Sequence, residues 1–148
     1  MTRDVIVSIK GTQFIDTSTD EPLELVTKGT YYKKNGKHYV FYDELIDGTQ
    51  GVTKNSLKFD DSSFMLTRSG AVNTSMLFEK ERRSVSNYQT PLGALTIGIN
   101  ASRLSVKEEE NIVSAHIDYA IDINYEYVAD CAISLKIQSS GKKSNDNN

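Results

Sequence analysis

The sequence of 148 residues contains no tryptophan, two prolines and a single cysteine. Because Cys131 has no partner within the chain, an internal disulfide is excluded, and this fits a reducing compartment such as the cytoplasm. No stretch approaches the roughly 20 apolar residues that cross a bilayer. The N-terminus enters a predicted strand directly, with no signal peptide. These absences predict a cytoplasmic protein without a membrane partner.

Histidine is also scarce, and the chain carries no excess of positive charge. With only His38 and His116, a histidine-rich metal site is not expected, and each is predicted to be a surface or cross-strand residue. A net charge of −3 and a pI of about 5.4 argue against nucleic-acid binding. Gly-x-Ser-x-Gly, phosphate-loop and dinucleotide motifs are missing. No cofactor and no nucleic-acid partner are therefore predicted.

What the sequence does have is alternation of apolar and polar residues with a period of two, from Asp4 to Gln138. This period is typical of strands with one buried face. Turn signals divide the pattern into ten extended segments. The predicted segments are 4–14, 23–33, 38–45, 52–59, 64–69, 72–79, 86–90, 92–101, 114–123 and 130–138.

The connections between these segments are short. Asn35-Gly36 is the strongest hairpin signal, because both positions tolerate positive φ, and Pro91 predicts a bulge or strand end. Residues 80–84 are predicted to form a charged tip. Residues 105–111, with three consecutive glutamates, are predicted to form a solvated loop in preference to a helical turn.

Short connections favour pairing between sequence neighbours, and a meander of eight to ten strands protects its edges by closing into an up-and-down barrel. A Greek-key sandwich would need longer connections and commonly a core tryptophan. The predicted fold class is therefore all-β, a single antiparallel up-and-down barrel. Residues 1–138 form the barrel domain, and residues 139–148, without an apolar side chain, form a disordered polar tail.

Seven short pieces, taken in order, resemble the YwiB-like family of small bacterial calycin-like (lipocalin-like) β-barrel proteins. The resemblance implies a lipocalin-like barrel fold over about residues 4–138, and it supplies no activity. The matching pieces are residues 4–13, 24–31, 39–44, 57–59, 68–70, 76–79 and 88–93.

Five polar residues near strand ends are the candidates for a site inside such a barrel: Tyr42, Glu44, Lys58, Arg68 and Tyr88. An interior arginine and glutamate would have to pair, because an unpaired buried charge is very costly. The preferred interpretation is an ion pair that fixes strand register. Alternatively, the guanidinium could hold a ligand carboxylate or phosphate in a bidentate fork.

Most of the aromatic side chains are predicted to pack across the sheet rather than line a cavity. The exceptions are Tyr42 and Tyr88, because of their motif context. Cys131 lies on an apolar alternating face and is predicted to be an inert core thiol.

Three functions remain open. The leading hypothesis is a non-enzymatic barrel that binds a small carboxylate or amphipathic ligand in its lumen. The second is a filled barrel that recruits a protein partner through residues 80–83 or 105–111. The third is a decarboxylase-like enzyme with Tyr42, Glu44, Arg68 and Tyr88 as catalytic candidates. Either a monomer or a homodimer is compatible with the sequence.

Overall fold

The computed structural model describes residues 3–11, 23–45, 51–70, 73–91 and 93–140, apart from the side chains of residues 23 and 88–90. These residues form ten strands. None of them forms a helix that could span a bilayer. The strands are β1 (Asp4–Gly11), β2 (Leu23–Lys34), β3 (Lys37–Leu45), β4 (Val52–Phe59), β5 (Ser63–Ser69), β6 (Thr74–Glu79), β7 (Arg83–Thr90), β8 (Gly93–Glu108), β9 (Ile112–Ile123) and β10 (Glu126–Ser139).

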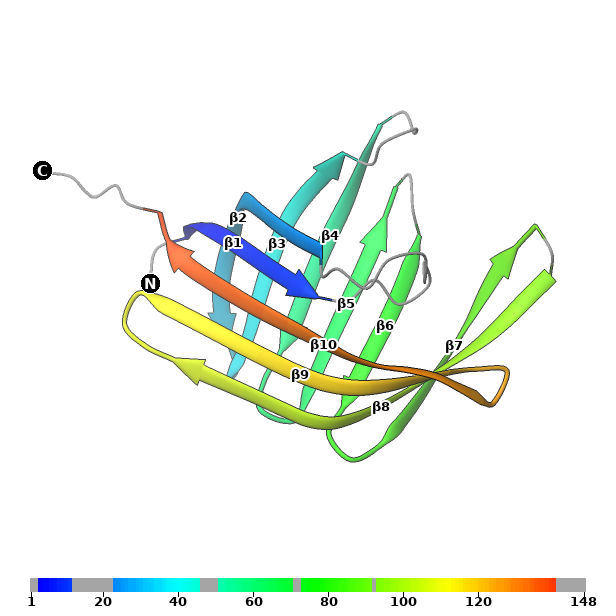
Figure 1. The fold of residues 1–148 in the computed structure, drawn as a ribbon. Coiled ribbons are helices and arrows are strands. Elements are labelled where there is room, and N and C mark those ends of the chain that lie inside the picture. Colours follow the sequence, from blue (N-terminus) through cyan, green and yellow to red (C-terminus); the bar gives the residue numbers. More distant parts are fainter. Residues whose placement is uncertain (1–2, 12–22, 46–50, 71–72, 92, 141–148) are drawn as a thin grey trace, which may run out of the picture.

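All ten strands belong to one antiparallel sheet with the order β6-β5-β4-β3-β2-β1-β10-β9-β8-β7 (Figure 1). Every strand lies beside its sequence neighbour except at β6–β7, and the first strand pairs with the last. The sheet curls into a nearly closed barrel, which confirms the predicted all-β, up-and-down fold. Of the predicted tail, residues 139–148, Ser139 is the last residue of β10 and pairs with Val5, and Ser140 N–H donates to Asp4 O. Residues 141–148 lie outside the described part.

The barrel closes between β6 and β7, in the middle of the chain, without a regular ladder. A bridge joins Glu79 to Arg82 at the turn, and further along Ser86 Oγ donates to Ser75 O at 3.1 Å. Glu81 N–H also donates to Ala101 O of β8 at 3.1 Å. We call this junction the β6–β7 seam.

Two-residue turns shape two of the hairpins. Asn35 and Gly36 have φ of 53° and 77°, which confirms the predicted turn between β2 and β3. Asn124 and Tyr125, with φ of 51° and 71°, form an equivalent turn between β9 and β10 that the residue types do not signal. As a result β10 begins at Glu126, four residues before its predicted start, with a bulge after Tyr127.

Two predictions about connections were wrong. Residues 105–108 continue β8 instead of forming a loop, and only residues 109–111 connect it to β9. The alternation persists there because Leu104 is buried and Val106 packs partly against the core. The charged tip is also shorter than predicted, because β7 begins at Arg83.

Inside the barrel, the side chains of β3–β6 form rows that cross the strands. The row nearest the 35–36 turn is aromatic: His38 stacks on Phe59 with ring centroids 4.9 Å apart, Phe59 on Phe64 at 5.2 Å, and Phe64 meets Phe78 edge-on at 6.0 Å. We call it the aromatic row. The next inward row is apolar and consists of Val40, Leu57, Leu66 and Met76.

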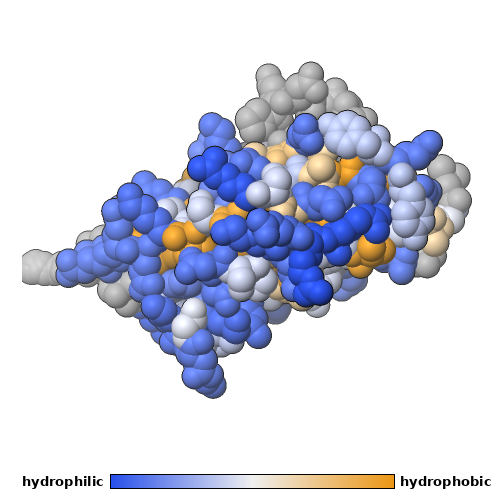
Figure 2. Space-filling model, turned by 90° about the horizontal axis from the view of Figure 1, so that it is seen from below, coloured by the Kyte–Doolittle hydropathy of each residue, from blue (hydrophilic) through white to orange (hydrophobic). Residues whose placement is uncertain are grey.

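The outer surface follows the polar half of the alternation. Figure 2 shows a mostly hydrophilic face with apolar residues in separate patches. The β9–β10 turn and the far ends of β7 and β8 project beyond the barrel (Figure 1). In this projection Val85, Tyr125 and Tyr127 are exposed.

Candidate functional site

A third inward row, opposite the aromatic row, is polar and spans three neighbouring strands. Tyr42 of β3 pairs in register with Asn55 of β4, and Asn55 with Arg68 of β5. Glu44 lies two residues beyond Tyr42 and points to the same side. Because the side-chain period of a strand is two, the sequence places all four side chains on the inward face. We call these four residues the polar row.

Glu44 is the centre of the contacts in the polar row. Arg68 Nη2 donates to Glu44 Oε1 at 2.9 Å, and Asn55 Nδ2 donates to the same oxygen at 3.3 Å. The Glu44 and Arg68 side chains are each 27% exposed, whereas Asn55 is 3% exposed. The pair is thus reachable by solvent from one side and supported by a buried amide from the other.

Tyr42 closes the inner side of the polar row and is only 7% exposed. Burial, and to a smaller extent the negative charge of Glu44, raises the pKa of Tyr42 to about 12, against an opposing effect of Arg68. The phenol is therefore protonated at neutral pH and available as a hydrogen-bond donor. The row offers a guanidinium, a carboxylate, an amide and a phenol within one small region.

The structure brings together three of the five residues predicted from the sequence: Tyr42, Glu44 and Arg68. Lys58 does not join them, because it lies on the outer face, with its Nζ 5.6 Å from the centroid of the Tyr39 ring. The Tyr88 side chain lies outside the described residues. The predicted Glu44–Arg68 pairing is present at 2.9 Å.

Sequence reasoning missed Asn55 and Thr53, which are buried at 3% and 0% exposure. Both share the inward face of β4 with Leu57 and Phe59. The alternation of β4 could have placed them there. Thr53 and Asn55 are polar, however, so from the sequence alone the first half of β4 gives no sign of which face points inward. The pairing of β4 with β3 is needed to decide this.

A second polar cluster lies at the other end of the barrel around His38, which was predicted to be a surface or cross-strand residue and is the latter, paired in register with Phe59. His38 is 4% exposed rather than a surface residue, and its Nδ1 lies 2.8 Å from the Tyr31 hydroxyl. Its Nε2 lies 3.8 Å from Glu108 Oε1, which also accepts from Lys33 Nζ at 2.9 Å. His38 therefore belongs to the interior, as one end of the aromatic row.

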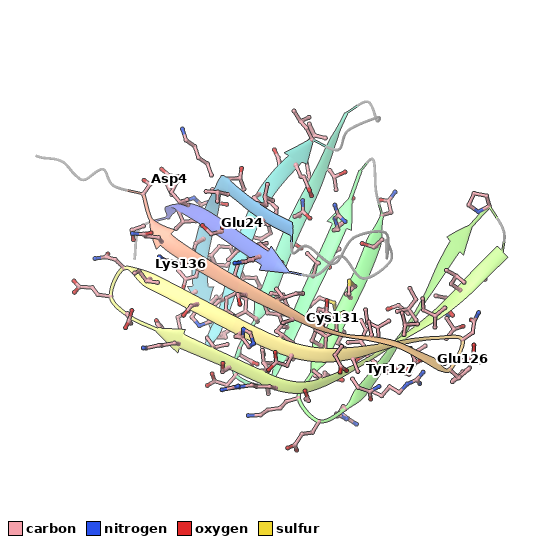
Figure 3. The ribbon with its side chains drawn as sticks, viewed as in Figure 1. Asp4, Glu24, Glu126, Tyr127, Cys131 and Lys136 are labelled. Atoms are coloured by element: carbon pink, nitrogen blue, oxygen red, sulfur yellow. The ribbon has the colours of Figure 1, made fainter. Side chains whose placement is uncertain are left out.

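Cys131 is buried and its thiol is free, as predicted for a core cysteine. Burial is the largest cause of the raised pKa of this thiol, which keeps it protonated. Figure 3 shows Cys131 near the middle of β10. Within the described ranges, no group of three or more His, Cys, Asp or Glu residues could hold a metal ion.

Comparison with known proteins agrees with this architecture. Residues 7–135 match the family model described as a domain of unknown function, DUF1934. The chain is 26% identical over 123 residues to "Uncharacterized beta-barrel protein YwiB" of Bacillus subtilis (strain 168), covering 82% of this chain and 85% of that protein. The crystal structure of YwiB from Bacillus subtilis superposes with a TM-score of 0.67 at 22% identity, covering 93% of this chain and 91% of the other. The match over most of its length makes this chain a member of the DUF1934 family of β-barrel proteins.

Proposed function

We propose that this protein binds a small amphipathic carboxylate at the polar row, with the apolar part of the ligand directed into the barrel. The observation that carries the proposal is the Glu44–Arg68 pair, half-buried at 2.9 Å and supported by Asn55. A charged pair inside a barrel is costly to desolvate and contributes little to stability by itself. A role in ligand recognition explains why such a pair is kept there.

The chemistry of Arg68 suits a carboxylate. A guanidinium presents five N–H donors in a planar fork, and the contact with Glu44 uses Nη2. A ligand carboxylate could take the remaining donors in a bidentate arrangement. Tyr42, protonated at neutral pH, supplies a further donor on the inner side of the row.

The apolar row lies one step further along the same strands and would receive the rest of the ligand. Leu66 and Met76 are paired in register, two residues from Arg68 and Thr74. Leu66 is only partly buried, so its side chain offers apolar surface one step below the polar row. The aromatic row fills the interior beyond this layer, which favours a short ligand.

A thermal-shift titration with hexanoate tests the proposal, with hexanol as the ligand that lacks the carboxylate. Hexanoate is expected to raise the melting temperature of the wild type, and hexanol is not. Arg68→Gln should abolish the shift. Lys58→Gln, which removes a charge on the outer face of the neighbouring strand, should retain it. Failure of hexanoate to shift the melting temperature of the wild type, or an equal shift in Arg68→Gln, would refute binding at the polar row.

The decarboxylase-like alternative uses the same Tyr42, Glu44 and Arg68. It also needs Tyr88, whose side chain lies outside the described residues, so ligand binding without catalysis is the simpler proposal. The single buried thiol of Cys131 supports a cytoplasmic location for this function.

A further inference from the structure

The outer face of β1, β10, β9 and β8 contains a hollow of about 560 Å³, on the opposite side of the sheet from the polar row. Two rows of outward side chains cross it. Its polar lining consists of Ser8, Lys10, Glu24, Ser105, Lys107, Ser114, His116, Ser134 and Lys136. Figure 3 labels Lys136 on β10 and Glu24 on β2, with β1 between the two strands.

Strand register explains how three lysines surround this hollow. Lys10 of β1 pairs with Ser134 of β10, and Ser8 pairs with Lys136. Lys136 pairs in turn with Ser114 of β9, and Ser114 with Lys107 of β8. Neighbouring strands are about 4.8 Å apart and alternate residues about 7 Å apart. Side chains as long as lysine can therefore direct all three ammonium groups toward one point.

The serines keep the centre of the hollow open and supply hydrogen-bond donors. Ser114 stands between Lys136 and Lys107 in one row, and Ser134 stands between Lys10 and His116 in the other, where larger side chains would fill the space. His116 lies between Ser134 and Ser105 in register. The hollow is thus lined by short hydroxyl side chains and one imidazole, together with the apolar residues Ile9, Val106, Ala115 and Leu135.

Asp118 orients the imidazole of His116. Its Oδ1 lies 2.8 Å from His116 Nε2, and a carboxylate accepts, so Nε2 carries a proton. In the neutral ring Nδ1 is then the acceptor, and the Ser134 hydroxyl donates to it at 2.9 Å. This chain of contacts fixes the position of Ser134 at the floor.

The charge of the hollow contrasts with that of the whole chain. Its lining holds three lysines and one carboxylate, Glu24, whereas the full sequence has a net charge of −3. Lys107 also lies 3.7 Å from Glu109, in a pair whose side chains are 76% and 54% exposed. An exposed pair of this kind is weak and is readily exchanged for a ligand anion.

We propose that this hollow binds a compact, multiply charged oxyanion of the phosphate class, carried by a small molecule. Three ammonium groups around a centre of hydroxyl donors match a tetrahedral anion with several acceptor oxygens. Glu24 lines the hollow, and Glu109 and Asp118 contact the lining residues Lys107 and His116. These carboxylates would repel an extended polyanion, so a nucleic-acid backbone is disfavoured. The site is independent of the carboxylate site inside the barrel.

An NMR titration with pyrophosphate tests this site directly. We expect saturable shifts of the backbone amides of Ser105, His116 and Ser134 in the 148-residue chain. Lys136→Gln should weaken the affinity about tenfold, as the loss of one charge-assisted hydrogen bond implies. Lys54→Gln is the matched control, because Lys54 is an outward lysine on β4 that pairs with Asp43, and it should leave the affinity unchanged.

Two further variants test whether pyrophosphate binds at the hollow and not at the polar row. Ser114→Glu places a carboxylate between Lys136 and Lys107 and should abolish binding while a urea titration confirms the fold. Arg68→Gln should bind pyrophosphate like the wild type, so failure at the polar row and failure here are distinguishable. Shifts that do not saturate, or equal affinities of wild type and Lys136→Gln, would overturn the proposal.

Discussion

The Tyr31 hydroxyl and Nδ1 of His38 lie 2.8 Å apart inside the barrel, and this contact defines the state of the imidazole. Burial raises the pKa of Tyr31, so the phenol is protonated and donates to Nδ1. The proton of the neutral ring is then on Nε2, which faces Glu108 Oε1 at 3.8 Å. One end of the aromatic row is thus a buried titratable group.

This arrangement predicts that stability falls in mild acid. Burial is the largest cause of the lowered pKa of His38, against an opposing effect of Glu108. The unfolded chain, with the ordinary pKa of 6.5, then binds a proton more readily than the folded protein. Stability should fall as the pH drops through 6.5 toward the folded pKa. We expect a lower urea midpoint at about pH 5.5 than at about pH 7.5.

His38→Phe removes the titration and keeps an aromatic ring beside Phe59. Because it also leaves the Tyr31 hydroxyl without its acceptor, the cleaner comparison combines it with Tyr31→Phe. The double variant should lose less stability than the wild type between the two pH values. An unchanged pH dependence in the double variant would show that His38 is not the group responsible.

Two glycines within strands should respond differently to alanine. A Cβ on Gly29 would lie 2.7 Å from the Phe41 carbonyl oxygen and 2.9 Å from Val7 Cγ2. Since backbone cannot move aside cheaply, we expect Gly29→Ala to lower the free energy of unfolding by about 2 kcal/mol. The three atoms nearest to a Cβ on Gly98 would be the ends of the Arg83 and Asp122 side chains.

Those two side chains form an ion pair, with Arg83 Nη2 2.7 Å from Asp122 Oδ1, and they can rotate away. Gly98→Ala should therefore lose the ion pair and little stability. Urea unfolding compares the two variants, and the NMR signal of the Arg83 Nε–H reports the ion pair. Equal losses at both positions would contradict this difference between rigid and mobile neighbours.

The fold could be predicted from the sequence because two local signals agree. The period of two set the faces of the strands, and turn residues such as Asn35 and Gly36 set the ends of a hairpin. Both signals fail where contacts with other strands determine the bounds of a strand or the conformation of a turn. Residues 105–108 are charged enough to resemble a loop, yet they continue β8 because β9 pairs with them. Tyr125 adopts a positive φ that its residue type does not indicate.

The candidate site was predictable to the extent that it depends on one strand. Tyr42 and Glu44 share a face by alternation alone, and Arg68 joins them through the order of the strands. Lys58 was misplaced because a strand end does not reveal which face points inward. The place of Asn55 in the site could not be predicted without the register between β3 and β4, and this register depends on pairing across the sheet.

The β6–β7 seam predicts opposite effects for two serines on one strand. Among the described residues, the Ser84 hydroxyl is buried without a hydrogen-bond partner. Removing it relieves the cost of desolvation, and Ser84→Ala should raise the free energy of unfolding by about 1 kcal/mol. Ser86 Oγ donates to Ser75 O across the seam, so Ser86→Ala should lower the free energy of unfolding by about 0.5 kcal/mol. Urea unfolding of both variants measures the signs, and equal signs would contradict this description of the seam.

The turn between β9 and β10 predicts a gain of stability on loss of an aromatic side chain. Tyr125 has a φ of 71°, a conformation that costs a residue with a Cβ about 1 kcal/mol, whereas Asn-Gly is the preferred pair for such a turn. The Arg83 guanidinium lies 5.2 Å from the centroid of its exposed ring, a contact that strain relief should outweigh. We expect Tyr125→Gly to raise the melting temperature. Tyr127→Gly, an equally drastic change at an exposed residue of β10, should lower it, because glycine weakens a strand. A lower melting temperature for Tyr125→Gly would mean that the contact with Arg83 stabilises the turn more than the positive φ strains it.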